Sequence, residues 1–538
     1  MHKILSVLFF FFIIPQQLMS QVSPEEGSLL NYRRVGFSFS VKDVIGKYKI
    51  EIAKGNYNTE DSFKKNIIQS VYTKTNRIIA EVPAFGSDYT WRIIYLLPKK
   101  SAFAGVLHHF STGYIPGIDT CKIRLRIIKQ AVKFKNDFVF VDGSNALYDM
   151  KGNPVWYIPV QDRKLKGNVL VRDLKISPQG TITFLLNQHA YEVNYNGDTL
   201  WRGPDNGMVN GEDSERYHHE LTRLSNGHYM ILGTEHVSWD HKVIHSADST
   251  TSFEFDDQVK PDNDIQNTKK TPFGTIIEYD EKGNVVWSWK SSKYFMGSDI
   301  VNYRPEGKAK VIDVHENAFY FDEQNQYIYV SFRNISRILK IKYPDGNIIS
   351  SYGEIFRPDT PAIGNGLFCE QHGIRRSKDG YLYLYNNNAC NDDKSLPTVV
   401  IMKEPDSEKG NLVKVWEYEC NIDGINVSPL MKKAFEQRKL LAKKNMVRKS
   451  WKGTLLHVTS GGNVIEMPDH SLFVCMNTQY SKIFIVNRDK KILWSAVPEK
   501  WNPGNNEWYI TYDQYRASIV TPKELDNLIW NAEQKNNK

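Results

Sequence analysis

Three histidines in this sequence occur in strand-turn-strand contexts of similar layout. His219 lies seven residues before the turn at 226–227 in YHHELTRLSNGHYMILGTE, and His372 lies seven residues before the turn at 379–380 in CEQHGIRRSKDGYLYLYN. His315 precedes a longer turn in DVHENAFYFDEQNQYIYVSFR. Asn-Gly and Asp-Gly pairs between alternating apolar residues are typical of β-hairpins. We therefore expect the three imidazoles to come from similar places in separate hairpins and to converge on one centre.

Converging imidazoles can bind either a metal ion or an anion. A metal site needs neutral imidazoles and usually a carboxylate for charge balance. Glu220 and Glu316 directly follow His219 and His315, but strand alternation turns such direct neighbours to the opposite side. The residue pattern therefore favours an anion site over a metal site.

An anion site also accounts for the other polar residues of these segments. Arg333 and Asn317 belong to the His315 segment, and Arg172 occupies the same frame position as His219. Arginine offers fixed, bidentate hydrogen bonds to the oxygens of sulfate or phosphate, and asparagine adds a neutral donor. An unprotonated imidazole beside the bound group can act as a nucleophile. The pattern thus predicts transfer of an oxyanion through a covalent histidine.

Six copies of a turn followed by an apolar, aromatic-containing strand indicate the elements that position these residues. The copies are YDMKGNPVWY, VNYNGDTLWR, EYDEKGNVVWSW, KYPDGNIISSYG, PDSEKGNLVKVWEY and NRDKKILWSA. Each copy follows two or three further strand-like runs, so the sequence predicts an all-β fold built around a six-bladed β-propeller.

In such a ring, residues near the start of the innermost strands face the central axis. The seven-residue frame assigns these places to Lys129, Arg172, His219, His315, His372 and Gly462. We expect the final segment, WYITYDQYRASI, to close the ring or to pack on it.

The chain divides into four expected parts. Residues 1–20 combine Lys3, an apolar run from 4 to 14 and a small-residue cleavage point, which is typical of a secretory signal peptide. Strand-like runs over 21–122 predict a small N-terminal β-sandwich domain. We expect a six-bladed β-propeller catalytic domain over 123–520 and a polar C-terminal tail over 521–538. The signal predicts export to the periplasm, and no other stretch is apolar enough to span a membrane.

Charge and cysteine content constrain partners and pairing. The formal net charge of +8 arises from 69 basic and 61 acidic residues, a mild surplus that suits small anions and gives little support to nucleic-acid binding. Export permits disulfides among the five cysteines. Cys369 and Cys390 bracket the His372 hairpin and are plausible partners, whereas free buried thiols are also compatible with the sequence.

The motifs resemble those of the arylsulfate sulfotransferases, exported bacterial enzymes built as six-bladed propellers. The resemblance rests on HHEL, on DVHEN with SFRN, on EQHGI with its turn, and on YDQYR near the end. It covers roughly residues 120 to 520. The N-terminal region agrees with that family's small β-sandwich in strand content alone.

The resemblance implies a role for each matched residue. His372 would be the catalytic nucleophile that becomes sulfated, His315, Arg333 and Asn317 would hold the sulfuryl oxygens, and His219 would complete the anion site. The family moves sulfate from one phenolic ester to another phenol by a ping-pong route, without a nucleotide sulfate donor. It also implies no cofactor and no metal, with aryl sulfates and phenols as small-molecule partners.

Two other functions remain compatible with the residues, and two details stay open. A propeller hydrolase or lyase could use a histidine-bound metal, and a non-catalytic propeller could serve as a binding platform. Either His218 or His219 of HHEL could face the axis, with His218 then binding substrate. The appended sandwich offers a surface for a homodimer.

Overall fold

The computed structural model describes two compact units, residues 1–113 and 114–538. The described residues are 22–40, 47–97, 102–114, 123–159, 170–238, 270–295, 301–303, 309–311, 314–353, 367–388, 396–406, 410, 412–426, 461–477, 481–511 and 514–535. The expected signal peptide, 1–20, lies outside them.

The first unit is built from two β-sheets that share one buried core. Its elements are β1 (Ser28–Leu30), β2 (Arg34–Ser38), β3 (Lys47–Lys54), α1 (Glu60–Lys65), β4 (Ile67–Thr73), β5 (Arg77–Glu81), β6 (Ser87–Leu96), β7 (Ala102–Ala104) and β8 (His108–Thr112). One sheet has the order β1-β8-β6-β3-β4 with β7 beside β6, and β2 pairs with β5. Phe37 of β2 and Trp91 of β6 meet in the core with ring centres 4.9 Å apart. The β-sandwich classification stays a prediction.

The second unit consists almost entirely of strands. They are β9 (Ile123–Lys129), β10 (Phe138–Val141), β11 (Ala146–Asp149), β12 (Pro154–Tyr157), β13 (Val171–Ile176), β14 (Ile182–Leu186), β15 (His189–Val193), β16 (Thr199–Arg202), β17 (Leu221–Arg223), β18 (Tyr229–Ser238), β19 (Lys270–Tyr279), β20 (Val285–Lys290), β21 (Val301–Tyr303), β22 (Ala309–Val311), β23 (Glu316–Asp322), β24 (Tyr327–Phe332), β25 (Arg337–Lys342), β26 (Ile348–Gly353), β27 (His372–Arg376), β28 (Leu382–Asn386), β29 (Thr398–Lys403), β30 (Val413–Glu419), β31 (Asn463–Glu466), β32 (Leu472–Cys475), β33 (Ile483–Val486), β34 (Ile492–Asn502), β35 (Glu507–Ile510) and β36 (Ala517–Val520). Short 3₁₀ turns follow β10 (Asp142–Ser144) and β20 (Ser291–Lys293).

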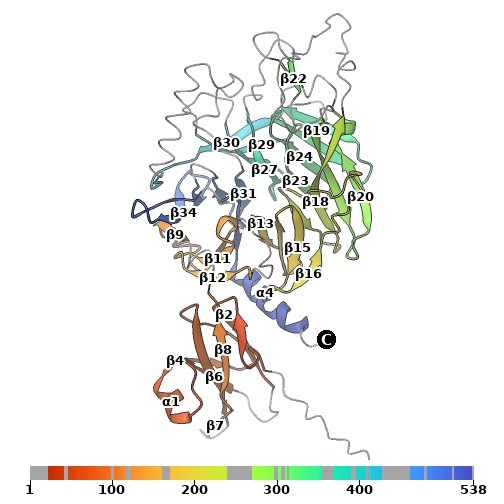
Figure 1. Ribbon diagram of the computed structural model, residues 1–538. Helices are drawn as coiled ribbons and strands as arrows, with labels where there is room; N and C mark the ends of the chain where they lie inside the picture. The colour runs from red at the N-terminus through yellow and green to blue at the C-terminus, as the bar shows by residue number, and fades with distance from the viewer. Residues whose placement is uncertain are drawn as a thin grey trace, which may run out of the picture. The chain divides into compact units, whose positions relative to one another are not determined.

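These strands form antiparallel sheets with the layout of propeller blades. Four-stranded sheets have the orders β12-β11-β10-β36, β13-β14-β15-β16, β17-β18-β19-β20, β23-β24-β25-β26 and β27-β28-β29-β30, and a larger sheet runs β31-β32-β33-β34-β35 with β9 beside β34 (Figure 1). The predicted all-β class is therefore confirmed. The count of six blades stays a prediction.

The predicted hairpins lie where the turn residues place them. Leu221 of β17 pairs with Ile231 of β18 across the turn at 226–227, and His372 of β27 pairs with Tyr385 of β28 across the turn at 379–380. Gly227 and Gly380 of these turns have φ of 92° and 86°, a left-handed backbone that favours glycine.

Neighbouring sheets contact one another in chain order through their first two strands. Contacts join β14 to β17, β18 to β23, β23 to β27, β27 to β31, β31 to β36 and β36 to β13. The C-terminal strand β36 pairs with β10, so that Ala517 lies opposite Val141. The expectation that the final segment closes the ring of sheets agrees with this pairing.

The same pairing overturns one axial assignment. Lys129 ends β9, which pairs with the outer strand β34, and its Nζ donates to the carbonyl of Ile492. The expectation that Lys129 faces the axis is therefore wrong, because a strand from the far end of the chain takes the innermost place in the first sheet.

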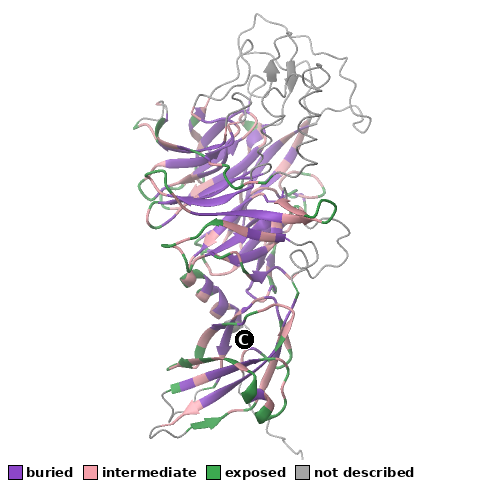
Figure 2. Ribbon diagram, turned by 90° about the vertical axis from the view of Figure 1, so that its left-hand side faces the viewer, coloured by how far each residue is buried: buried purple, intermediate pink, exposed green. Residues whose placement is uncertain are grey.

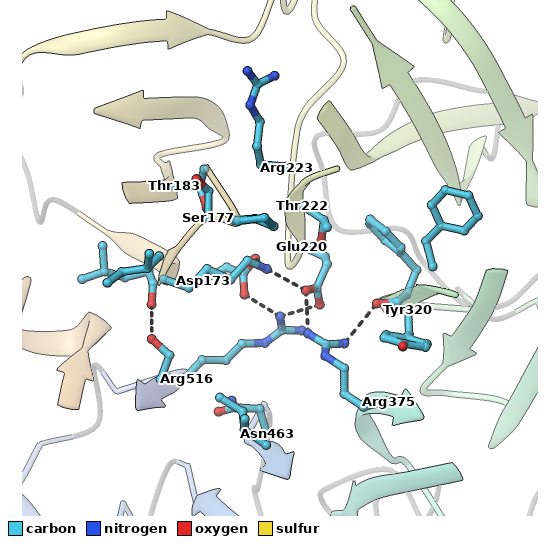
Figure 3. Close-up of a pocket in the computed structure, with 18 of the residues that line it drawn as sticks. Asp173, Ser177, Thr183, Glu220, Thr222, Arg223, Tyr320, Arg375, Asn463 and Arg516 are labelled. Atoms are coloured by element: carbon cyan, nitrogen blue, oxygen red, sulfur yellow. Dashed lines mark hydrogen bonds and ion pairs between the residues drawn. The ribbon is translucent and has the colours of Figure 1, made fainter. Parts of the chain in front are cut away.

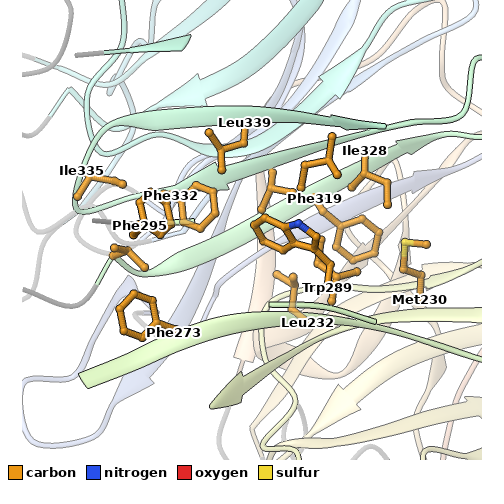
Figure 4. Close-up of a cluster of buried hydrophobic side chains, with 14 of the residues drawn as sticks. Met230, Leu232, Phe273, Trp289, Phe295, Phe319, Ile328, Phe332, Ile335 and Leu339 are labelled. Carbon is orange, nitrogen blue, oxygen red and sulfur yellow. The ribbon is translucent and has the colours of Figure 1, made fainter. Parts of the chain in front are cut away.

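Apolar side chains fill the space between adjacent sheets. One cluster joins the β17–β20 sheet to the β23–β26 sheet and includes Leu232, Phe273, Trp289, Phe319 and Phe332, all buried (Figure 4). Buried residues run along the strand interiors of this unit (Figure 2). Such packing holds the first strands at fixed separations.

Helix α4 (Pro522–Lys535) replaces most of the expected polar C-terminal tail. Leu525, Leu528 and Ile529 recur at helical spacing and are buried, so the polar residues between them occupy the other face. The tail prediction failed because it weighed composition and overlooked this period. No helix among the described residues is long and apolar enough to cross a membrane.

Candidate active site

His372 is fully buried at the start of β27, and its hydrogen bonds fix the position of its proton. Nδ1 lies 2.6 Å from Oδ1 of Asn387, an amide whose Nδ2 donates to the carbonyl of Gly461. The Asn387 oxygen can only accept, so Nδ1 carries the hydrogen. Nε2 accepts the backbone N–H of Gly461 at 3.0 Å. The lone pair that a nucleophile needs therefore lies on Nε2.

Electrostatics keep this imidazole neutral. Burial lowers the pKa of His372 well below the usual value for histidine, and the nearby positive charge of Arg333 lowers it further. The hydrogen bond to Asn387 opposes these effects to a smaller extent. At neutral pH the Nε2 lone pair is therefore unprotonated.

His219 faces the shared centre, and His218 holds the His219 ring in place through a hydrogen bond. The ring of His219 lies 5.2 Å from the ring of His315 and 5.6 Å from that of Tyr515, between ring centres. His218 Nε2 donates to the carbonyl of Gly233 at 3.0 Å, and its Nδ1 lies 2.6 Å from Nδ1 of His219. A neutral His218 therefore accepts the Nδ1 hydrogen of His219. This arrangement leaves a lone pair on Nε2 of His219.

Burial also lowers the pKa of His219 well below its usual value. The neighbouring imidazoles of His218, His315 and His372 add to this effect, as does the Arg516 charge. His219 is thus a neutral acceptor in the resting site.

Arg333 and Asn317 both lie next to the histidine centre, in different settings. Arg333 forms an ion pair with Glu370, and its backbone N–H donates to the His315 carbonyl at 2.9 Å. Asn317 is buried, and its Nδ2 donates to the backbone carbonyl of Gln371 at 2.7 Å. One of the two amide hydrogens of Asn317 therefore holds the chain just before His372.

The backbone at this centre is strained. His219, His315 and Glu370 have φ of 60°, 54° and 50°, in the left-handed region that non-glycine residues rarely adopt. Such conformations cost about 1 to 3 kcal/mol each and cluster at functional sites. These three residues lie one or two positions before strands β17, β23 and β27 begin, so the chain bends directly before each strand.

Tyr515 occupies the middle of the cluster, and the sequence frame missed it. Its ring lies 6.3 Å from that of His372, and the guanidinium of Arg172 lies 5.0 Å from the ring centre. Burial raises the pKa of Tyr515 to about 12 against the opposing charges of Arg516, Arg172 and Arg333. Arg172 therefore lies in this cluster, and its role in binding substrate stays a prediction. The motif YDQYR was the signal that could have identified Tyr515.

A cavity of about 290 Å³ opens beside the histidines. Its lining includes His218, His219 and His315 together with Phe273 and Arg216. A larger cavity of about 580 Å³ is lined by Glu220, Arg375 and Arg516 and includes none of the site histidines (Figure 3). The smaller cavity gives access to the imidazoles of His219 and His315, whereas His372 lines neither of these two cavities.

Cys369 lies three residues before His372 and is disulfide-bonded. Its expected partner, Cys390, lies outside the described residues, so this pairing stays a prediction. Cys420 and Cys475 are free and buried.

Comparisons with known proteins identify the family. Low similarity links the chain to three solved structures: a protein of unknown function from Bacteroides caccae (11% identity, 71% of this chain and 98% of that chain, TM-score 0.37), an auxiliary nutrient binding protein from Bacteroides thetaiotaomicron (10%, 94% and 95%, 0.32) and apo AztD from Citrobacter koseri (7%, 88% and 98%, 0.29). These values are too low to support an argument. No curated protein matches.

The family model described as "Arylsulfotransferase (ASST)" matches residues 125–259 and 239–428. The matched region includes His219, His315, Arg333 and His372, which the fold brings together around Tyr515. Because the model spans more than half of the chain, this protein belongs to the arylsulfotransferase (ASST) family.

Proposed function

We propose that this protein transfers a sulfuryl group from a phenolic sulfate ester to an acceptor phenol through a sulfohistidine at His372, without a nucleotide donor. Family membership supports aryl sulfotransferase activity in general. The observation that carries the finer proposal is the buried His372, whose proton is held at Nδ1 by Asn387 and whose lone pair lies on Nε2.

In the first half-reaction, Nε2 of His372 attacks the sulfur of the bound aryl sulfate. The N–S bond forms while the S–O bond to the aryl group breaks, and the phenolate leaves with the bonding electron pair. Arg333 and Arg172 lie near the site as fixed positive charges, which stabilise negative charge on the sulfuryl oxygens and on the departing oxygen.

Attack requires His372 to give up one hydrogen bond. In the resting site the Gly461 N–H occupies Nε2 at 3.0 Å, so this N–H must move aside as sulfur approaches. The hydrogen stays on Nδ1 of His372, donated to Oδ1 of Asn387, throughout, and the product is a sulfuryl group on a positively charged imidazole. That charge makes the ring a good leaving group for the second step.

In the second half-reaction, the oxygen of an acceptor phenol attacks the same sulfur. The S–O bond forms, the N–S bond breaks, and the pair returns to Nε2 of His372. The phenol proton moves to a base, and Nε2 of His219 is the neutral acceptor that the hydrogen bonds leave available. The first phenolate takes a proton from solvent, and His219 later releases the proton of the acceptor phenol to solvent, so the two half-reactions balance.

The cavity of about 290 Å³ supports a small aromatic substrate. Phe273 and Pro272 contribute apolar groups to its lining, and His219 and His315 contribute imidazoles. Pockets for small ligands usually combine apolar walls with a few fixed polar groups. The expected export to the periplasm belongs to the same proposal, because the reaction needs no nucleotide sulfate donor from the cell interior.

The test uses the full chain with p-nitrophenyl sulfate, with and without added phenol, beside His372→Ala. We expect nitrophenol release to depend on the phenol, to follow ping-pong kinetics and to be lost in the variant. Mass spectrometry of protein treated with donor alone should find one sulfuryl group on the peptide that carries His372. Release that ignores the phenol would indicate a sulfatase, and activity lost to a chelator and restored by a metal would indicate a metal enzyme.

A further inference from the structure

An ionic network built on the buried Arg516 and Glu220 lines the cavity of about 580 Å³ and is joined to the segments of the histidine centre. The guanidinium of Arg516 donates to Asp173 at 2.8 Å and to Glu220 at 2.6 Å. Glu220 also accepts from Arg375 at 2.6 Å and from Lys175 at 2.9 Å. Figure 3 shows the two guanidinium groups meeting at the Glu220 carboxylate.

Three members of this network, Asp173, Glu220 and Arg516, are adjacent in sequence to residues of the histidine centre. Glu220 follows His219, and Arg516 follows Tyr515. The second guanidinium nitrogen of Arg516 donates to the backbone carbonyl of Asn317 at 3.0 Å. Asn317 in turn holds the carbonyl of Gln371, the residue before His372. One arginine near the end of the chain therefore connects the segments that carry the site.

The network has more positive than negative members. Three cations, Lys175, Arg375 and Arg516, face two carboxylates, Asp173 and Glu220. Burial acts to raise the pKa of Glu220, but Arg375 and Arg516 outweigh it and hold that pKa well below its usual value. Among these five side chains the cations therefore outnumber the carboxylates by one.

We propose that Arg516 and Glu220 are positioning residues of the transfer reaction, whose buried ion pair sets the relative places of the site segments and supplies fixed positive charge to the histidines. This inference rests on the proposed function for its kinetic readout. Neither residue lines the 290 Å³ cavity, so both act through the groups they hold.

The charge and the geometry of Arg516 can be separated by substitution. Arg516→Lys keeps the charge but cannot span Asp173, Glu220 and the Asn317 carbonyl together, because an ammonium lacks the planar fork of a guanidinium. We expect kcat to fall roughly a hundredfold, as small misplacements of catalytic groups do, while the acid limb of the pH profile stays in place.

Two neutral variants should move that limb in opposite directions. The charged or titratable groups around His372 include Arg333, His315, Arg516, His219 and Tyr515. Arg516→Gln removes a cation, so the pKa of His372 rises and activity is lost at a higher pH than in the wild type. Glu220→Gln removes an anion, so that pKa falls and the limb moves to lower pH. A residue that merely supports the fold would leave the limb unchanged in both.

Glu499→Gln is the matched control. Glu499 is a buried carboxylate of the same unit that pairs with Arg124 and Arg126 at 2.7 Å each. It should lose stability as Glu220→Gln does, yet keep the wild-type pH profile. NMR titration of the His372 ring, with its signals assigned by comparison with His372→Gln, measures the same pKa shifts without any turnover. Failure of this inference can therefore be told apart from failure of the proposed function. The inference would be overturned if Arg516→Gln and Glu220→Gln both kept the acid limb of the wild-type pH profile and the wild-type pKa of His372.

Discussion

At the scale of single residues, the choice of Asn387 as partner of His372 sets the chemistry. An amide oxygen fixes the Nδ1 hydrogen at 2.6 Å without adding a negative charge. A carboxylate in this place would stabilise the protonated imidazole and block the lone pair. The positive charge of Arg333 therefore favours the unprotonated state, and the hydrogen bond to the neutral Asn387 opposes it only to a smaller extent.

Asn387→Asp tests this argument. The introduced carboxylate should raise the pKa of His372, so that the acid limb of kcat/KM moves to higher pH and activity near pH 6 falls more than activity near pH 8. In the wild type the lowered pKa predicts that activity persists well below the usual histidine value and is lost only as pH falls through the lowered pKa. Coinciding acid limbs in the two proteins would contradict the role given to Asn387.

The sequence could predict the histidines but not the groups that tune them. His219, His315 and His372 each precede a turn at a readable spacing, and hairpin turns are local features. Asn387 lies fifteen residues beyond His372, and Arg516 lies nearly three hundred residues beyond Glu220. Their meeting depends on how whole sheets pack, which no local frame encodes.

At the scale of elements, strand β23 packs a buried acid against strand β19. Neither carboxyl oxygen of Glu316 has a hydrogen-bond partner of good geometry among the described residues. A side chain at Gly274 of β19 would overlap that carboxyl group. Burial raises the pKa of Glu316 to about 8, with a smaller opposing effect from the Ser291 hydroxyl. The glycine makes room for an acid that is mostly protonated at neutral pH.

Glu316→Gln should therefore stabilise the fold. The unfolded carboxyl loses its proton above its usual pKa, whereas the folded one keeps it up to about pH 8, so stability falls as pH rises through that window. The amide mimics the protonated form and removes this loss, which is worth roughly 2 to 3 kcal/mol at pH 7. Urea denaturation near pH 4 and near pH 7 measures it, with a gain expected only at the higher pH. A gain of the same size at both pH values would count against a protonated Glu316.

At the scale of the whole molecule, all the site residues belong to the unit of residues 114–538. A chain limited to that unit should keep acceptor-dependent nitrophenol release with a kcat within about twofold of the full chain, because no catalytic contact is removed. Steady-state kinetics beside circular dichroism measure this. A folded unit without turnover would show that the first unit contributes to catalysis.

The closing strand β36 has a consequence for the order in which the protein gains activity. A ribosome delivers His219, His315 and His372 long before it delivers Tyr515, Arg516 and the strand that follows them. Until that strand pairs with β10, the first sheet has an open edge and the ionic network lacks its central cation. A chain that ends before Arg516 and β36 would therefore lack both the pairing with β10 and the guanidinium that joins Asp173 to Glu220.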